Sequence, residues 1–89
     1  MKIQFKKTFN KNFEKLGRKL QMKTHEKIGL FQKDPFEETL SNHALIWEYK
    51  WFRSIDITGD YRAIFREYPN GTYEFVDFIF VWTHSQLYG

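Results

Sequence analysis

The chain has 89 residues, which is enough for a single domain spanning positions 1–89. A hydrophobic fraction of 42% and an aromatic fraction of 20% suit a packed core and exclude a disordered chain. The absence of cysteine excludes disulfides, thiolate catalysis and cysteine-based metal sites. No apolar run approaches the roughly 18 residues that span a bilayer, and the N-terminus lacks the apolar region of a signal peptide. We therefore expect a cytoplasmic protein with no membrane partner.

The formal net charge of +3 is unevenly distributed along the chain. Residues 1–33 contain ten Lys and Arg against two acidic residues, which gives +8, whereas the remainder contains four basic and nine acidic residues, which gives −5. A basic half-surface is typical of proteins that bind a polyanion such as RNA. A solvated, lysine-rich helical face has the same composition, so charge alone leaves both interpretations open.

The first third of the chain changes from a strand pattern to a helical one. Residues 2–7 alternate polar and apolar side chains and predict a half-buried strand. Thr8 is expected to cap a helix whose apolar residues recur at helical spacing, and Gly17 is expected to interrupt it. A second helix should end at Asp34-Pro35, because the residue before proline disfavours helical geometry. Two short antiparallel helices fit this stretch.

The second half of the chain has the period of two that is typical of strands. Arg53, Ile55 and Ile57 share one face of the first of these strands, and Ser54 and Asp56 share the other. The predicted segments are a loop at 34–45, strands at 47–57, 61–67 and 73–82, and turns at 58–60 and 69–71, the latter containing Asn70-Gly71. The order β-α-α-β-β-β predicts an α+β domain, with an antiparallel sheet and two helices packed on one face.

Polar residues near the ends of the last strands are candidates for chemistry. His84 suits proton transfer because histidine titrates near neutral pH, and Arg62 can hold a phosphate by its planar fork, with Arg53 on the neighbouring strand to reinforce it. Taken alone, a histidine such as His84 or His43 is better explained as structural or exposed, and Asp60 as a turn residue. The alternative for the arginines is surface ion pairing with Asp56 or Glu67. The three histidines lack ligand spacing and there is no phosphate-binding glycine motif, so we expect neither a metal nor a cofactor.

Three segments together resemble the RelE/ParE toxin superfamily, and in particular its YafQ-like branch. They are Asn42-His43-Ala44-Leu45, the run from Arg53 to Phe65 that contains Ile57-Thr58-Gly59-Asp60-Tyr61-Arg62, and the C-terminal Thr83-His84-Ser85-Gln86-Leu87-Tyr88-Gly89. Each motif is modest by itself. Their order and spacing, together with the basic helical segment that precedes them, make the resemblance extend over essentially the whole chain.

The resemblance implies a RelE-like fold and the toxin of a type II toxin–antitoxin module. Such a toxin is a metal-independent, ribosome-dependent mRNA endonuclease, in which a ribose 2′-OH attacks the adjacent phosphate. The implied partners are the ribosome, its mRNA and a cognate antitoxin that wraps the toxin in a hetero-oligomer. An antitoxin segment that meets the +8 region is expected to be acidic or amphipathic.

The resemblance also assigns roles by position. It gives His84, His43, Asp60, Arg62 and Tyr88 as the expected catalytic residues and Arg53 as an expected substrate-binding residue. Trp82, Lys15, Arg18 and Lys19 are further expected substrate-binding residues, because an indole can stack on a base and a basic segment can bind RNA. A histidine would move a proton to the leaving 5′-oxygen, an arginine would stabilise charge on the phosphorane, and a carboxylate or second histidine would activate the 2′-OH.

The chain departs from the YafQ-like pattern at several positions. Asp56 stands where that branch has a further histidine, and Trp82 precedes Thr83-His84 where glycine is usual. Trp47 and Trp51 also stand where relatives often have glycine. An indole at position 82 either stacks on a base or obstructs the cleft. Two alternatives therefore stay open: a ParE-like inhibitor of DNA gyrase, and a catalytically weakened module that retains only antitoxin binding.

Overall fold

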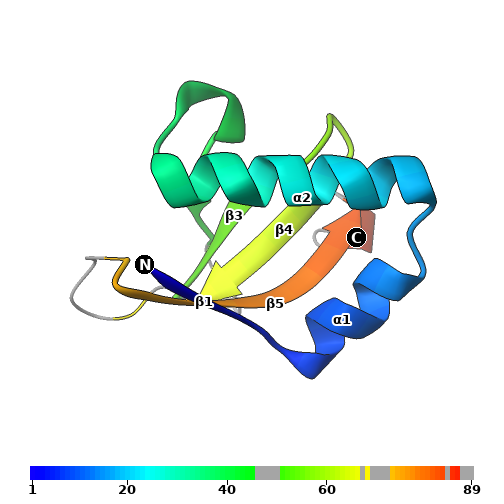
Figure 1. The fold of residues 1–89 in the computed structure, drawn as a ribbon, viewed down its shortest axis with the longest axis horizontal. Coiled ribbons are helices and arrows are strands. Elements are labelled where there is room, and N and C mark those ends of the chain that lie inside the picture. Colours follow the sequence, from blue (N-terminus) through cyan, green and yellow to red (C-terminus); the bar gives the residue numbers. More distant parts are fainter. Residues whose placement is uncertain (46–50, 67, 69–72, 84, 87–89) are drawn as a thin grey trace.

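The computed structural model describes residues 1–45, 51–66, 68, 73–83 and 85–86 (Figure 1). Its elements in chain order are β1 (Lys2–Phe5), α1 (Lys7–Glu14), α2 (Arg18–Lys33), the 3₁₀ helix η1 (Glu38–Leu40), β2 (His43–Ala44), β3 (Phe52–Asp56), β4 (Tyr61–Arg66) and β5 (Phe75–Thr83). The predicted sequence of one strand, two helices and three long strands is confirmed. Within the described residues, neither α-helix has the length and apolar character that a membrane span requires.

The strands form one five-stranded sheet in the order β1-β5-β4-β3-β2. Neighbours from β2 to β5 pair antiparallel, as the predicted meander requires, but β1 pairs parallel to β5. The sheet is therefore mixed, and the expectation of a purely antiparallel sheet is wrong at this edge. β1 and β2 lie at opposite edges of the sheet, and the two helices lie between them in the chain. The meander then brings β5 back beside β1, and the two strands run in the same direction.

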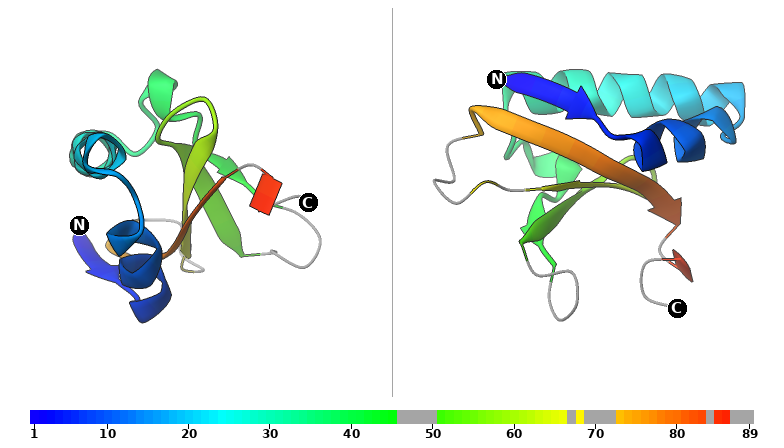
Figure 2. Two further views of the ribbon diagram at one scale, coloured as in Figure 1. Left: turned by 90° about the vertical axis from the view of Figure 1, so that its right-hand side faces the viewer. Right: turned by 90° about the horizontal axis from the view of Figure 1, so that it is seen from below.

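Both helices lie on one side of the sheet (Figure 2, left and right). The core between these layers is aromatic: Phe31 of α2 is fully buried and meets the rings of Phe65 and Phe78 at centroid distances of 5.0 and 5.5 Å. Phe9 of α1 is 5.9 Å from Phe78. Edge-to-face and tilted ring pairs of this kind combine a large buried area with specific geometry, so they fix how the helices seat on the strands. The predicted packing of both helices on one face is confirmed.

Local details of the N-terminal half differ from the sequence prediction. Thr8 lies inside α1, whose N-cap is Lys6, and the Thr8 hydroxyl donates instead to the carbonyl of Ile79 at 2.6 Å. It thus ties α1 to β5 rather than capping the helix. The second helix ends at Lys33, one residue before Asp34-Pro35, as expected from the proline.

The segment after α2 contains more structure than the predicted loop. It forms η1 and then β2, which pairs with β3 over two residues. The following strand begins at Phe52 rather than at position 47, and Trp51 adopts a positive φ of 79° that interrupts extended backbone. Positions 46–50, which include Trp47, lie outside the described residues.

Candidate functional site

The sheet has a face that the helices leave open, and the strand register decides which residues share it. Directly paired residues point to the same side of a sheet. One cross-strand row on this open face runs through His43, Ser54, Ile64 and Phe80. A second row runs through Asp56, Arg62 and Trp82. His43 and Arg62, two of the polar candidates marked in the sequence, thus share one surface with aromatic and apolar residues, and we call this surface the open face.

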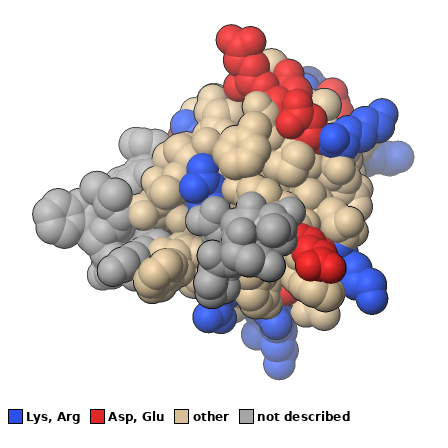
Figure 3. All heavy atoms as spheres, turned by 90° about the vertical axis from the view of Figure 1, so that its left-hand side faces the viewer, with Lys and Arg blue, Asp and Glu red and all other residues tan. Residues whose placement is uncertain are grey.

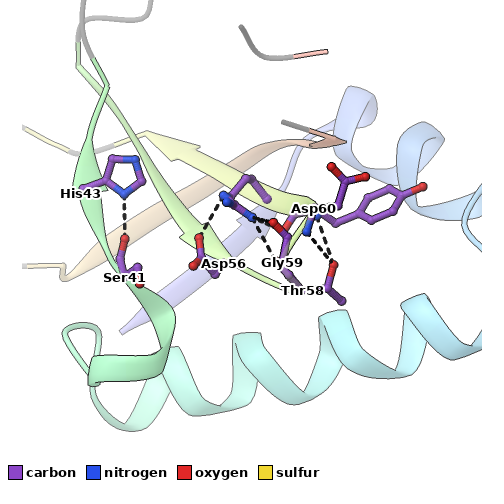
Figure 4. A network of polar contacts seen from close by, with 8 residues as sticks. Ser41, His43, Asp56, Thr58, Gly59 and Asp60 are labelled. Carbon is purple, nitrogen blue, oxygen red and sulfur yellow. Dashed lines mark hydrogen bonds and ion pairs between the residues drawn. The ribbon is translucent and has the colours of Figure 1, made fainter. Parts of the chain in front are cut away.

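Arg62 is held in place by four oxygen atoms around it. Its Nε lies 3.0 Å from Oδ1 of Asp56, and its Nη1 donates to the carbonyls of Thr58 at 2.9 Å and Gly59 at 3.1 Å, with Tyr61 at 3.4 Å (Figure 4). The side chains of Arg62 and Asp56 are 17% and 29% exposed. A half-buried guanidinium with this many contacts is well oriented, because each contact removes rotamer freedom that an exposed arginine keeps.

The turn beneath Arg62 is closed by a threonine hydroxyl. Thr58 Oγ1 accepts from the backbone N–H groups of Asp60 and Tyr61 at 3.3 and 3.1 Å, and the Ile57 N–H donates to the Tyr61 carbonyl at 2.9 Å. The Asp60 carboxylate is therefore not needed to close the turn. It is exposed, and Figure 4 shows it directed away from Asp56. An exposed carboxylate that is not committed to the turn remains available to a ligand.

His43 stands on β2 at the opposite edge of the open face. Its Nδ1 lies 2.7 Å from the carbonyl oxygen of Ser41, a residue with a positive φ of 47° at the end of η1 (Figure 4). A carbonyl oxygen can only accept, so Nδ1 is the donor and Nε2 is the basic nitrogen of the neutral ring. The ring is exposed. This tautomer leaves Nε2 able to take a proton from a group bound over the open face.

Arg53 lies on the helix-covered side of the sheet, because it pairs with Phe65 rather than with a residue of the open face. Its Nε donates to Oδ1 of Asn42 at 2.8 Å, and its guanidinium lies 5.7 Å from the ring centroid of Phe36. Asn42 in turn donates to the Pro35 carbonyl at 2.9 Å. Arg53 therefore anchors the segment after α2 to the sheet, and it does not reinforce Arg62, contrary to the sequence-based expectation.

Trp82 lies beside Arg62 in the same cross-strand row. Its indole stacks on Phe80 with a centroid distance of 4.0 Å and an interplanar angle of 17°. The two rings pack with Phe52 around the small buried cluster of Leu45 and Ile64, and Trp82 makes further contacts of its own. The pair forms an aromatic surface next to a guanidinium, which is the combination that binds bases and phosphates of single-stranded nucleic acid.

The basic residues expected to bind substrate lie where α1 ends and α2 begins. Lys15 is the C-cap of α1, and Arg18 and Lys19 open α2; all three are exposed. A cavity of about 240 Å³ is lined by Lys19, Leu20, Lys23 and Thr58, so this end of α2 adjoins the turn that holds Arg62. Lys23 joins the group, although the sequence pattern did not single it out.

The two ends of α2 differ in charge. Figure 3 views the end of the molecule where α2 finishes, and acidic side chains gather there at the top of the view. Asp34, Glu37 and Glu38 belong to the segment that follows the helix. A helix of 16 residues is about 24 Å long, so this acidic end is well separated from Arg18 and Lys19. Arg18 and Lys19 thus lie at the end of α2 that adjoins Thr58, apart from this acidic segment.

His84 and Tyr88 lie outside the described residues, so their predicted roles remain predictions. Thr83 and Gln86 form a reciprocal capping pair: Gln86 N–H donates to Thr83 Oγ1 at 3.1 Å, and Thr83 N–H donates to Gln86 Oε1 at 2.8 Å. Thr83 pairs with Tyr61, so β5 ends beside the start of β4. The turn at 85–86 lies on the side of the sheet away from the helices (Figure 2).

A second polar cluster lies at the other end of β5. Asp77 is buried, its Oδ2 accepts from the Tyr68 hydroxyl at 2.6 Å, and Lys6 Nζ lies 3.7 Å from the same oxygen. The hydrogen bond to Asp77, followed by burial and the charge of Asp77, raises the pKa of Tyr68 above its ordinary value. Asp77 pairs with Arg66, four residues beyond Arg62, so the cluster is separate from the Arg62 site. Within the described residues, no group of three potential metal ligands is present.

Comparison with solved structures identifies the fold. No protein-family model matches the chain, and no curated protein matches it in sequence. Among solved structures, YafQ from Escherichia coli BL21(DE3) superposes with a TM-score of 0.78 at 18% identity, covering 98% of this chain and 97% of YafQ. A YoeB/ParE toxin from Agrobacterium tumefaciens gives 0.75 at 18% identity, with 94% and 99% covered.

The RelBE2 toxin–antitoxin complex of Mycobacterium tuberculosis contains a further similar chain, with a TM-score of 0.72 at 20% identity and 93% and 96% of the two chains covered. These similarities extend over nearly the full length of each protein. At such identities they show a shared fold. The chain therefore has the fold of the RelE/YafQ-like toxins, as the resemblance of its motifs led us to expect.

Proposed function

We propose that the protein is the toxin of a toxin–antitoxin module and an endoribonuclease that cleaves mRNA on the ribosome. The observation that carries the proposal is the open face, where an oriented arginine, a histidine whose Nδ1 is bonded to a carbonyl and a stacked aromatic pair share one surface. Supporting it, several of the similar solved structures are toxins, and those of YafQ and RelBE2 include complexes with an antitoxin. An antitoxin is accordingly the expected protein partner.

The chemistry follows from what each group can do to an RNA phosphate. Arg62 stabilises the negative charge that develops when the 2′-OH attacks the adjacent phosphorus. His43 through Nε2, or Asp60 through its exposed carboxylate, accepts the proton of that 2′-OH. His84 donates a proton to the departing 5′-oxygen, and the product retains a 2′,3′-cyclic phosphate. None of these steps needs a cofactor.

Substrate binding uses surfaces on either side of the turn at 58–60. Trp82, stacked on Phe80, offers its ring to a base next to the reacting phosphate. The basic start of α2, with Lys19 and Lys23 beside Thr58, attracts RNA phosphates further along the strand or on the ribosome. Such sequence-independent contacts suit a nuclease whose substrate is positioned by the ribosome.

The test is induced expression followed by mapping of mRNA 5′ ends for the wild type, His84→Ala and Trp82→Gly. The wild type should produce new 5′ ends within translated regions, and His84→Ala should lose them while accumulating to the same level. A decrease in cleavage for Trp82→Gly identifies the indole as a stacking platform, whereas an increase identifies it as an obstruction. DNA damage without mRNA cleavage would instead favour a gyrase inhibitor, and unchanged growth of cells with abundant protein would favour an antitoxin-binding module.

A further inference from the structure

The hydrogen-bonding capacity of Arg62 is already largely used within the protein. Nε is occupied by Asp56 and Nη1 by the carbonyls of Thr58 and Gly59. Within the described residues, Nη2 makes no hydrogen bond. A phosphate that approaches the open face thus meets a guanidinium whose charge is balanced by a neighbouring carboxylate. The phosphate can bind both Nε and Nη2 of Arg62 only if Asp56 releases Nε.

The pairing of Asp56 with Arg62 is imposed by the hairpin rather than by chance contact of long side chains. The two residues are directly opposite in the β3–β4 register, and both belong to the open face. The carboxylate is short and carried by a strand, so it has fewer rotamers that take it away from Arg62 than a glutamate on a loop has. A carboxylate and a phosphate can each present two oxygen atoms to the guanidinium group, so they compete for the same nitrogen atoms.

We propose that Asp56 is an internal substitute for the substrate phosphate, which holds Arg62 over the turn and lowers the affinity of the free protein for RNA. On binding, Arg62 exchanges Asp56 Oδ1 for a phosphate oxygen at Nε and adds a second contact through Nη2. Asp56 is thus a positioning residue that acts through Arg62. The inference rests on the proposed function, because it takes the phosphate to be that of RNA bound on the open face.

The consequence is selectivity for RNA that is held by additional contacts. A free strand must displace Asp56 with its own binding energy, whereas a strand presented by the ribosome is already positioned when it reaches Arg62. The same pair keeps Arg62 oriented in the empty protein, so little reorganisation is needed when the phosphate arrives.

The experiment measures binding of a short 2′-O-methyl RNA, which cannot be cleaved by 2′-OH attack, to the full chain by fluorescence anisotropy at several salt concentrations. Asp56→Asn keeps an oxygen that can accept from Nε and removes only the charge. We expect it to bind about three- to tenfold more tightly than the wild type. The plot of log K against log salt should steepen by about 0.7, which corresponds to one further phosphate neutralised on a single strand.

Glu38→Gln is the matched control, because it removes the same charge from an exposed position on η1, and its affinity should stay within about 1.5-fold of the wild type. The gain of Asp56→Asn should disappear when it is combined with Arg62→Gln. A gain that persists without Arg62, or equal affinities of Asp56→Asn and the wild type, would overturn the proposal. So would the absence of measurable binding by either protein at low salt.

A second measurement uses only the wild-type protein, so its outcome does not depend on whether a variant folds. The ¹⁵N resonance of Arg62 Nε should shift on addition of the oligonucleotide, because its partner changes from carboxylate to phosphate. An unmoved resonance at saturating oligonucleotide would contradict the exchange. The uncleavable probe separates this result from the proposed function, since mRNA cleavage in cells can fail while the exchange at Arg62 is observed, or the reverse.

Discussion

Replacing Ser54 with alanine should stabilise the protein, although Ser54 lies in the middle of the open face. Ser54 is fully buried between its cross-strand neighbours His43 and Ile64. Its hydroxyl oxygen has no hydrogen-bond partner among the described residues. A buried hydroxyl that leaves water without gaining a partner costs about 1–3 kcal/mol.

Alanine removes that cost and leaves only the space of one oxygen atom, which offsets part of the gain. We expect a net increase of about 1 kcal/mol in the free energy of unfolding, which raises the Tm of a domain of this size by about 4–8 °C. Thermal unfolding followed by circular dichroism measures the shift, and urea unfolding at 25 °C measures the free energy independently.

Thr24→Val is the matched control, because the buried hydroxyl of Thr24 does make a hydrogen bond. It is 1% exposed, but its Oγ1 donates to the Leu20 carbonyl at 2.7 Å. Removing a satisfied hydrogen bond should lower stability by about 1 kcal/mol. A lower Tm for Ser54→Ala would contradict this prediction. So would a change of stability in the same direction for both variants, because the two hydroxyls would then be equally well hydrogen-bonded.

Three further predictions concern other parts of the molecule. Tyr68 should ionise at a higher pH than an ordinary tyrosine, so tyrosinate absorbance near 295 nm should contain a late component that Tyr68→Phe removes and Asp77→Asn moves to lower pH. Because the pKa of Tyr68 is raised in the folded protein, its hydrogen bond stabilises the fold below pH 10, and this stabilisation is lost as the pH rises through the folded pKa. An unchanged alkaline unfolding curve for Tyr68→Phe would contradict this. Phe78→Ala should cost about 3–5 kcal/mol in urea unfolding, because its ring is fully buried against four other phenylalanines, and a loss below 1 kcal/mol would be inconsistent with that packing. Arg53→Met should lower the Tm without changing RNA affinity, since Arg53 contacts Asn42 and Phe36 on the covered side.

The faces of the strands could be predicted because alternation is a local property of the sequence. Tyr61, Ala63 and Phe65 were assigned to one side and Arg62 and Ile64 to the other, and the structure has them so. The parallel position of β1 could not be predicted in this way, since the partner of an edge strand depends on where two helices return the chain. Two-residue strands such as β2 leave no periodicity at all.

The sequence offers Arg62 two kinds of neighbour, a reinforcing Arg53 or an ion-pair partner in Asp56 or Glu67, and the structure has the ion pair with Asp56. The alternation that puts Arg53 with Ile55 also puts Asp56 on the other face of the strand. The hairpin register then decides which residue faces Arg62, and a tight turn centred on Gly59 pairs Asp56 with Arg62. Resemblance to a family suggested a cation at the preceding strand, whereas the turn length indicates a carboxylate. Local geometry was the better guide here.

The residues that stabilise the fold lie mainly on the covered face of the sheet, whereas the strand residues proposed to bind RNA lie on the open face, and this difference can be measured. The covered face is stabilised by apolar aromatic packing around Phe31 and Phe78, which gains free energy from every buried ring. The open face contains a half-buried ion pair at Arg62 and, at Ser54, a buried hydroxyl that has no hydrogen-bond partner among the described residues, and both groups cost desolvation. Substitutions on the covered face should therefore change the free energy of unfolding with little effect on RNA affinity well below the Tm. Substitutions of Arg62 or Asp56 that raise stability should alter binding, because these partly exposed charged groups cost desolvation and are also the ones that a phosphate can reach.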